Sequence, residues 1–236
     1  TFCINESDAV TAVSESLKAA TFEHFKITRD IHVISNFVVP ESEKSVFSEH
    51  MRLKYASDGE RIVCHISNFR KVKRVDDVVR VFALLNKAIP SKLILVGDGP
   101  ERYLCERLCR EFNLCDKVIF LGKVRDTTHV LEIADVFLLP SETESFGLAA
   151  LEAMAVGVPV ISSNTGGIPE VNIHGYSGYL SNVGDVEDMA KNMIQLLHPD
   201  NLPTFKINAK ERSKEFSLEK ILPLYEEIYR NLVLNK

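Results

Sequence analysis

Residues 136–155 read VFLLPSETESFGLAALEAMA, and this stretch decides the fold class because a buried strand, a polar loop and a buried helix follow one another in it. Val136–Leu139 is a short apolar run, typical of a strand buried on both faces of a parallel sheet. Residues 148–156 predict a helix, which Gly157 and Pro159 end. Residues 160–162 then predict the next strand, so the order is that of a βα unit.

The same alternation continues towards the N-terminus. The helix predicted over residues 75–88 carries apolar side chains at helical spacing, for example Val75, Val78, Val79 and Phe82. Further strands are expected at residues 62–67, 93–96 and 118–121, and further helices at 101–112 and 128–134. The fold class is therefore α/β, a Rossmann-like doubly wound parallel sheet. Such sheets bind ligands beyond the carboxyl ends of their strands, so the loops there should share one edge.

Two carboxylates in the central stretch are candidates for ligand binding. The predicted helix is apolar on every side except at Glu152, and a carboxylate there costs several kcal/mol unless donors meet it. A hydroxyl-rich ligand is one such partner, and a buried arginine in a structural ion pair is the other. Glu144 lies in the loop before the helix, either in the same cleft or as a helix cap. Gly147 lets a ligand approach the backbone, and the helix N-terminus suits phosphate.

A second loop on the expected ligand edge is basic. Residues 68–74 read NFRKVKR, four bases in the last five positions of an acidic protein. Such a run is either a solvated face or a set of cations that neutralises a diphosphate leaving group. Its position after a predicted strand favours the second reading. The glycine pair Gly97 and Gly99 does not complete a dinucleotide fingerprint, because Arg102 stands at the third position, which argues against an NAD-dependent dehydrogenase.

Composition and charge argue against several kinds of partner and site. With 28 basic and 33 acidic residues the net charge is −5, so we expect no nucleic-acid partner. Apolar runs are far shorter than the ~18 residues that span a bilayer, so we expect no membrane partner. Five cysteines without framework spacing indicate a reducing cytoplasm. Cys105, Cys109 and Cys115 are interpreted as packing rather than as metal ligands.

Taken together, these motifs resemble the retaining glycosyltransferases of family four. Glu144 and Glu152 form an E-x7-E motif within ESFGLAALEAM, and VGDGPE at residues 96–101, FLG at 120–122, GVPVI at 157–161 and TGGIPE at 165–170 accompany it. The flanking segments SDAVTAVS (7–14), HISNFRKVKR (65–74) and YEEIY (225–229) are similar to the bacterial members that transfer N-acetylglucosamine to L-malate in bacillithiol synthesis. The resemblance covers nearly the whole chain.

The resemblance implies roles for individual residues. Glu144 contacts the transferred sugar, Glu152 the ribose, and the amides of Phe146, Gly147 and Leu148 the diphosphate. Ser145, in the same loop, is also expected to bind the donor. Lys73 matches the phosphate-binding lysine. Many relatives carry arginine where this chain has Asn68, and Arg70 is taken as the substitute cation. Gly122, Lys123 and Val124 hold the uracil. Neither a metal nor another cofactor is implied.

The resemblance also implies a GT-B organisation, in which two Rossmann-like domains face each other across a cleft. Residues 1–38 are then expected to be the end of an acceptor domain, 39–215 the donor-binding domain, and 216–236 a helix that crosses back. Expected partners are UDP-N-acetylglucosamine or UDP, L-malate in the full-length enzyme, and a second copy of the chain in a homo-oligomer. The fragment is expected to be inactive alone. A UDP-sugar-binding module, or a family-four transferase with another acceptor, stays as the alternative.

Overall fold

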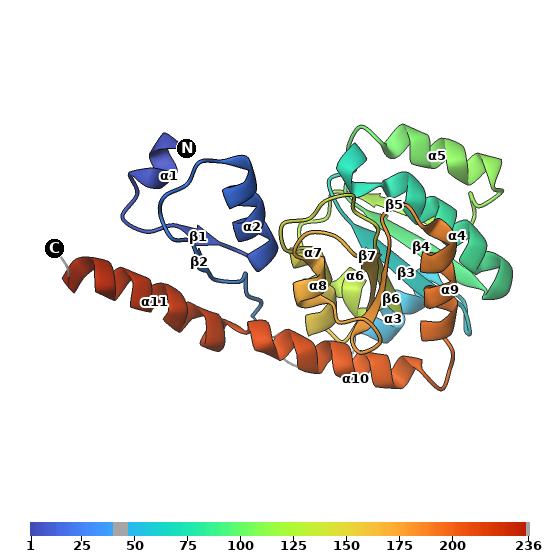
Figure 1. The fold of residues 1–236 in the computed structure, drawn as a ribbon. Coiled ribbons are helices and arrows are strands. Elements are labelled where there is room, and N and C mark those ends of the chain that lie inside the picture. Colours follow the sequence, from blue (N-terminus) through green and yellow to red (C-terminus); the bar gives the residue numbers. More distant parts are fainter. Residues whose placement is uncertain (40–46, 235–236) are drawn as a thin grey trace.

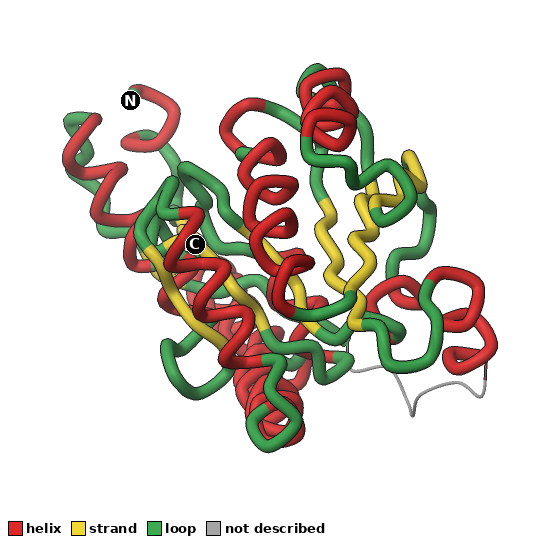
Figure 2. The backbone as a smooth tube through the Cα atoms, turned by 90° about the vertical axis from the view of Figure 1, so that its right-hand side faces the viewer, coloured by secondary structure: helices red, strands yellow, loops and turns green. Residues whose placement is uncertain are grey.

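A computed structural model of the chain describes residues 1–39 and 47–234. Its centre is a sheet of six parallel strands in the order β5-β4-β3-β6-β7-β8 (Figures 1 and 2). The strands are β3 (Arg61–Ile66), β4 (Ser91–Val96), β5 (Val118–Gly122), β6 (Val136–Leu139), β7 (Val160–Ser163) and β8 (Gly178–Ser181). The chain winds outward from β3 to one edge and then from β6 to the other. This arrangement confirms the predicted doubly wound parallel sheet.

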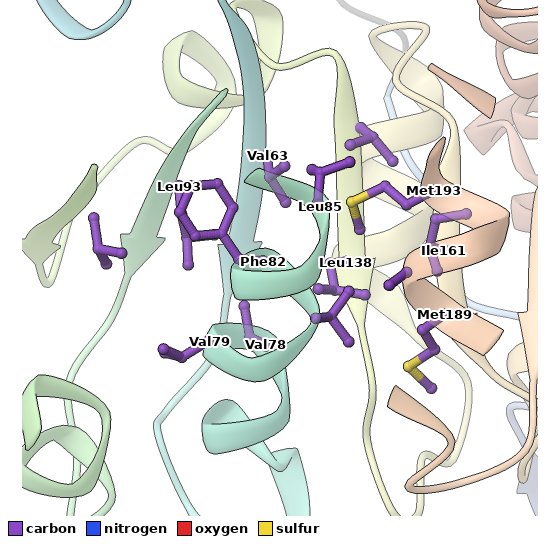
Figure 3. Packing of buried hydrophobic residues seen from close by; sticks show 14 of the residues in the cluster. Val63, Val78, Val79, Phe82, Leu85, Leu93, Leu138, Ile161, Met189 and Met193 are labelled. Carbon is purple, nitrogen blue, oxygen red and sulfur yellow. The ribbon is translucent and has the colours of Figure 1, made fainter. Parts of the chain in front are cut away.

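Helices cover both faces of the sheet. Helices α4 (Val75–Ala88), α5 (Arg102–Glu111) and α9 (Val186–Leu196) lie on one face, and α3 (Phe47–Tyr55), α6 (Thr128–Glu132), α7 (Leu148–Ala155) and α8 (Ile168–Val171) lie on the other (Figure 1). Helix α10 (Leu202–Ser213) contributes to both layers, because Leu202 and Phe205 pack in the first and Ala209 in the second. Helix α4 has the bounds that its apolar spacing predicts. Figure 3 shows Val78, Val79 and Phe82 of α4 beside Val63 and Leu93 of the sheet and, further along, Met189 and Met193 of α9. Cys105 and Cys109 are buried in this same layer, as expected of packing residues, whereas Cys115 is exposed, which contradicts that interpretation for it.

The first 39 residues form a small unit beside the sheet. It contains α1 (Phe2–Asn5), β1 (Thr11–Ala12), α2 (Glu15–His24) and β2 (His32–Val33), and its two strands pair in parallel. Ser14 caps α2, because its side chain accepts the N–H of Leu17. The strand that precedes this helix is only two residues long.

The C-terminal part is helical, as expected. The 3-10 turn η2 (Lys214–Phe216) joins α10 to α11 (Leu218–Leu234), which runs below the unit formed by residues 1–39 (Figure 1). Residues 197–201, around Pro199, separate α9 from α10, and Pro203 lies in the first turn of α10, where the missing N–H costs nothing. Strand β8 and the short helix α8 were not predicted at all.

A buried ion cluster holds the amino edge of the sheet. Asp135, just before β6, contacts Arg52 of α3 at 2.7 Å, Lys206 of α10 at 3.4 Å and Arg61 of β3 at 3.7 Å. Its carboxylate also accepts the N–H of Ile62 at 2.9 Å. Burial alone raises the pKa of Asp135, but Lys206 and Arg52 outweigh burial and hold that pKa below its usual value. This cluster ties four elements together at the edge opposite the candidate site.

Candidate functional site

The strand order reverses between β3 and β6, and the loops after these two strands carry the residues that the sequence singled out. Lys73 ends the 3-10 turn η1 (Lys71–Lys73) after β3, and Glu144 lies in the loop after β6. Lys73 Nζ donates to Glu144 Oε2 at 2.6 Å, and both side chains are partly buried. The fold thus joins two predicted site residues that are 71 positions apart, at the point where open parallel sheets bind ligands.

A buried histidine sits beneath this ion pair. His65 of β3 is fully buried, with Nδ1 2.8 Å from the carbonyl oxygen of Leu138 and Nε2 2.8 Å from Ser67 Oγ. Since a carbonyl only accepts, Nδ1 carries the proton and Nε2 accepts from Ser67. Burial lowers the pKa of His65 to about 4. A neutral imidazole therefore links β3 to β6 at the switch point.

The loop before α7 presents backbone rather than side chains. Gly147 is the N-cap of α7 with a φ of 96°, and no side chain caps the helix. The alternative reading of Glu144 as a helix cap is therefore wrong, because Glu144 turns to Lys73 instead. Phe146 is buried while Ser145 and Leu148 are exposed. Among the described residues, no acceptor takes the N–H of Phe146 or Gly147, so both are available at the positive end of α7.

Glu152 has no protein partner in the part of the chain that the structure describes. It forms neither a hydrogen bond nor an ion pair there, which removes the buried-arginine alternative for those residues. Burial raises the pKa of its half-buried carboxyl. Glu152 and Leu148 help to line a groove of about 290 Å³ between α7, α6 and residues 37–39. The larger cavity, about 710 Å³ beside α4 and α9, contains none of the predicted site residues.

Two glycine loops fit against the backbone of the site. A Cβ on Gly97 would lie 1.8 Å from the carbonyl oxygen of Ser67, and a Cβ on Gly167 would lie 2.3 Å from that of Ser145. The N–H of Gly167 also donates to the carbonyl oxygen of Glu144 at 2.9 Å. These approaches require glycine, so the two motifs shape the loops after β3 and β6.

The remaining predicted residues are spread along the same edge. Asn68 and Arg70 are exposed in the loop after β3, and the Arg70 side chain makes no ion pair with any described residue. Lys123 is exposed after β5, and Val124 packs against the core. Gly122 accepts the N–H of Gly97 through its carbonyl oxygen at 2.8 Å, which joins the loops after β4 and β5. The structure therefore brings the side chains of Lys73 and Glu144 into contact, whereas among the described residues no hydrogen bond or ion pair joins the Arg70 or Lys123 side chain to either of them.

Sequence reasoning missed two contacts of this site. Ser14 Oγ donates to the carbonyl oxygen of Ser145 at 2.7 Å, and the carboxylate of Glu170 accepts the N–H groups of Glu15 and Ser16, each at 2.9 Å. In the sequence, Ser14 and Glu170 stand out only as members of the SDAVTAVS and TGGIPE segments. No local signal in the sequence reveals partners 131 to 155 residues away.

Two other features are absent from the residues that the structure describes. No group of three or more His, Cys, Asp or Glu side chains there is arranged to hold a metal ion. Within the same residues, every helix is too short or too polar to cross a membrane.

Comparison with known proteins defines the class. The family model described as "Glycosyl transferases group 1" matches residues 47–212. This match spans most of the chain and includes the loops after β3 and β6, so the chain belongs to the group 1 glycosyl transferases.

Particular relatives sharpen this assignment. The chain is 45% identical over 241 residues to an N-acetyl-alpha-D-glucosaminyl L-malate synthase from Bacillus anthracis, covering 98% of this chain and 62% of that protein. A sucrose-phosphate synthase structure from Thermosynechococcus elongatus matches with a TM-score of 0.87 and 28% identity, over 99% of this chain and 60% of that one. TarM from S. aureus, solved with UDP, matches with a TM-score of 0.82 and 25% identity, over 97% of this chain and 44% of that one. The chain thus spans about half to two thirds of these proteins.

Proposed function

We propose that this chain supplies the donor site of a retaining glycosyltransferase that moves N-acetylglucosamine from UDP-N-acetylglucosamine to L-malate. The observation that carries the donor site is the Lys73–Glu144 pair at the switch point, together with the Phe146 and Gly147 amides of the same loop, which have no acceptor among the described residues. The 45% identity to a malate synthase supports the choice of sugar and acceptor.

Each part of the site has a role in this proposal. Lys73, assisted by Arg70 after a side-chain movement, compensates the negative charge that develops on the departing diphosphate. The amides of Phe146 and Gly147 bind phosphate oxygens at the start of α7. Glu152, a carboxylate without a protein partner among the described residues, accepts hydrogen bonds from the ribose hydroxyls. These bonds would offset the free-energy cost of burying its charge. Lys123 and Val124 face the uracil.

Glu144 is proposed to orient the sugar rather than to attack it. Lys73 already neutralises this carboxylate at 2.6 Å, and a nucleophile paired so closely with a cation is weakened. Transfer with retention then follows from departure of the diphosphate and entry of the acceptor hydroxyl on the same face, with the leaving phosphate accepting the acceptor's proton. The scheme assigns the charge compensation to protein cations and amides.

The test separates binding from transfer. Isothermal calorimetry on this 236-residue chain should show binding of UDP and of UDP-N-acetylglucosamine. Release of UDP should not depend on L-malate, because the described residues contain one Rossmann-like sheet and transfer also needs an acceptor held in line with water excluded. A folded sample that binds no UDP contradicts the donor site, and rapid malate-dependent turnover contradicts the two-domain mechanism.

A further inference from the structure

Helix α2 begins against the loop that precedes α7. Its N-cap Ser14 is fully buried, and Ser14 Oγ accepts the N–H of Leu17 at 3.0 Å. The same oxygen donates its single proton to the carbonyl oxygen of Ser145 at 2.7 Å. A helix cap uses only the acceptor side of a hydroxyl. The donor side of Ser14 is therefore committed to the site loop, and capping does not account for it.

The acceptor of this bond belongs to a peptide group of the proposed diphosphate site. The carbonyl of Ser145 and the N–H of Phe146 are parts of one planar trans peptide, so they point in opposite directions. A hydrogen bond to the oxygen fixes this plane and polarises the N–H. Among the described residues the Phe146 N–H has no acceptor, which leaves it for a ligand. The preceding peptide is fixed in the same way by the N–H of Gly167.

Other contacts keep Ser14 in place. The Glu170 carboxylate holds the first turn of α2 through two backbone N–H groups, and Arg212 donates to the carbonyl oxygen of Glu170 at 2.6 Å. On the other side of the loop, the Phe146 ring packs edge-on against Phe216, with centroids 5.6 Å apart. The Ser145–Phe146 peptide is thus held from the N-terminal unit and from the C-terminal segment together.

We infer that Ser14 is a positioning residue for diphosphate recognition. Although it lies outside the six-stranded sheet, its hydroxyl aligns the Phe146 N–H with a phosphate oxygen and couples residues 1–39 to the donor loop. The inference rests on the proposed function, because it names the device that orients one of the phosphate-binding amides.

The test uses variants that separate capping from the contact to Ser145. Ser14→Asp keeps a good helix cap but lacks the proton, and Ser14→Thr keeps both functions. We expect UDP affinity, measured by calorimetry, to fall about 3- to 10-fold in Ser14→Asp, the scale of one neutral hydrogen bond, and to stay within about twofold in Ser14→Thr. Uridine, followed by NMR titration, should bind both variants as it binds the wild type, because it has no phosphate.

A matched control addresses stability. Asp185 caps α9 by accepting the N–H of Asp188 at 3.0 Å, so Asp185→Ala loses a cap elsewhere. It should lower the Tm and leave UDP affinity unchanged, whereas Ser14→Ala should lower both. If Ser14→Asp does not fold, Ser14→Ala is compared with Asp185→Ala. At an equal loss in Tm, only Ser14→Ala should show a lower UDP affinity.

The outcomes separate this inference from the proposed function. If Ser14→Asp and Ser14→Ala both bind UDP with wild-type affinity, the inferred role of Ser14 is overturned, but the proposed function is not. An equal loss for UDP and uridine also overturns it, because that loss reports a general disturbance. Absence of UDP binding by the wild-type chain overturns the donor site itself, and the inference with it.

Discussion

Asp135 precedes β6 at the amino edge of the sheet, and Glu152 lies on α7, which starts at the carboxyl edge. Asp135 is surrounded by three cations and one backbone N–H, and its pKa stays below the usual value despite burial. Glu152 has no such partner among the described residues, and burial raises its pKa. The difference supports the proposal that Asp135 serves the fold and that Glu152 binds a ligand.

The first test of this comparison is Lys73→Ala in the whole protein, assayed for transfer from UDP-N-acetylglucosamine to L-malate. We expect a loss of about 100-fold or more in kcat/KM, the scale of removing one electrostatic stabiliser. Lys71→Ala is the matched control, since Lys71 is an exposed base on the same 3-10 turn. Equal activity of both variants would remove Lys73 from the site.

Asp135→Asn should act on the other edge and on stability alone. The three cations around it would lose their shared anion, although each is about 30% exposed and partly screened by water. We expect a loss of about 2 kcal/mol in the free energy of unfolding, measured with urea at pH 7. The folded variant should bind UDP with wild-type affinity. A weaker affinity would contradict a purely structural role for Asp135.

Glu152→Gln should give the opposite pattern. The amide keeps the shape but loses the charged acceptor, so UDP binding should weaken by about 1–3 kcal/mol in calorimetry. Because burial disfavours the ionised Glu152 in the fold, the Tm should stay constant or rise. A much lower Tm with unchanged UDP affinity would instead make Glu152 a structural residue.

His65 gives the smallest expected effect, a pH dependence of stability. Its pKa is about 4 in the fold and 6.5 ordinarily, so only the unfolded chain takes up a proton as the pH falls through 6.5. Stability is therefore lost between pH 6.5 and 4, by about 1 kcal/mol between pH 7 and 5.5. The free energy of unfolding of His65→Gln, measured with urea, should not show this loss as the pH falls. An unchanged pH dependence in that variant would mean that His65 is not buried neutral.

The strands and helices with clear apolar periodicity were predictable. Helix α4 has its predicted bounds, and β6 likewise. Strand β8 escaped prediction because it is short and starts with glycine, which sequence patterns assign to turns. Gly178 is required there, since a Cβ would lie 1.8 Å from the carbonyl oxygen of Val160. The order of the strands is not encoded in periodicity either, since β6 pairs with β3 across two intervening βα units.

The candidate site was predictable where its signal is local. Gly147 and Glu152 stand out because they interrupt an apolar stretch, and Glu144 because it lies in the polar loop between a buried strand and a buried helix. Their pairings were not predictable, because Lys73 meets Glu144 only through the strand order. His65 carried a weak signal, a polar residue within a strand that is otherwise buried. The ligand contacts assigned to all the site residues stay predictions, those of Lys73, Glu144 and Glu152 included.

The hydrogen bond between Ser14 and Ser145 closes a loop of 131 residues, which bears on the order of folding. Bringing such distant segments together costs about 4 kcal/mol of chain entropy before any contact forms. The βα units between them rely on much shorter separations and form faster. We therefore expect the six-stranded sheet to assemble first and α2 to dock onto it late, so that the loop before α7 acquires its final alignment only in the last stage of folding.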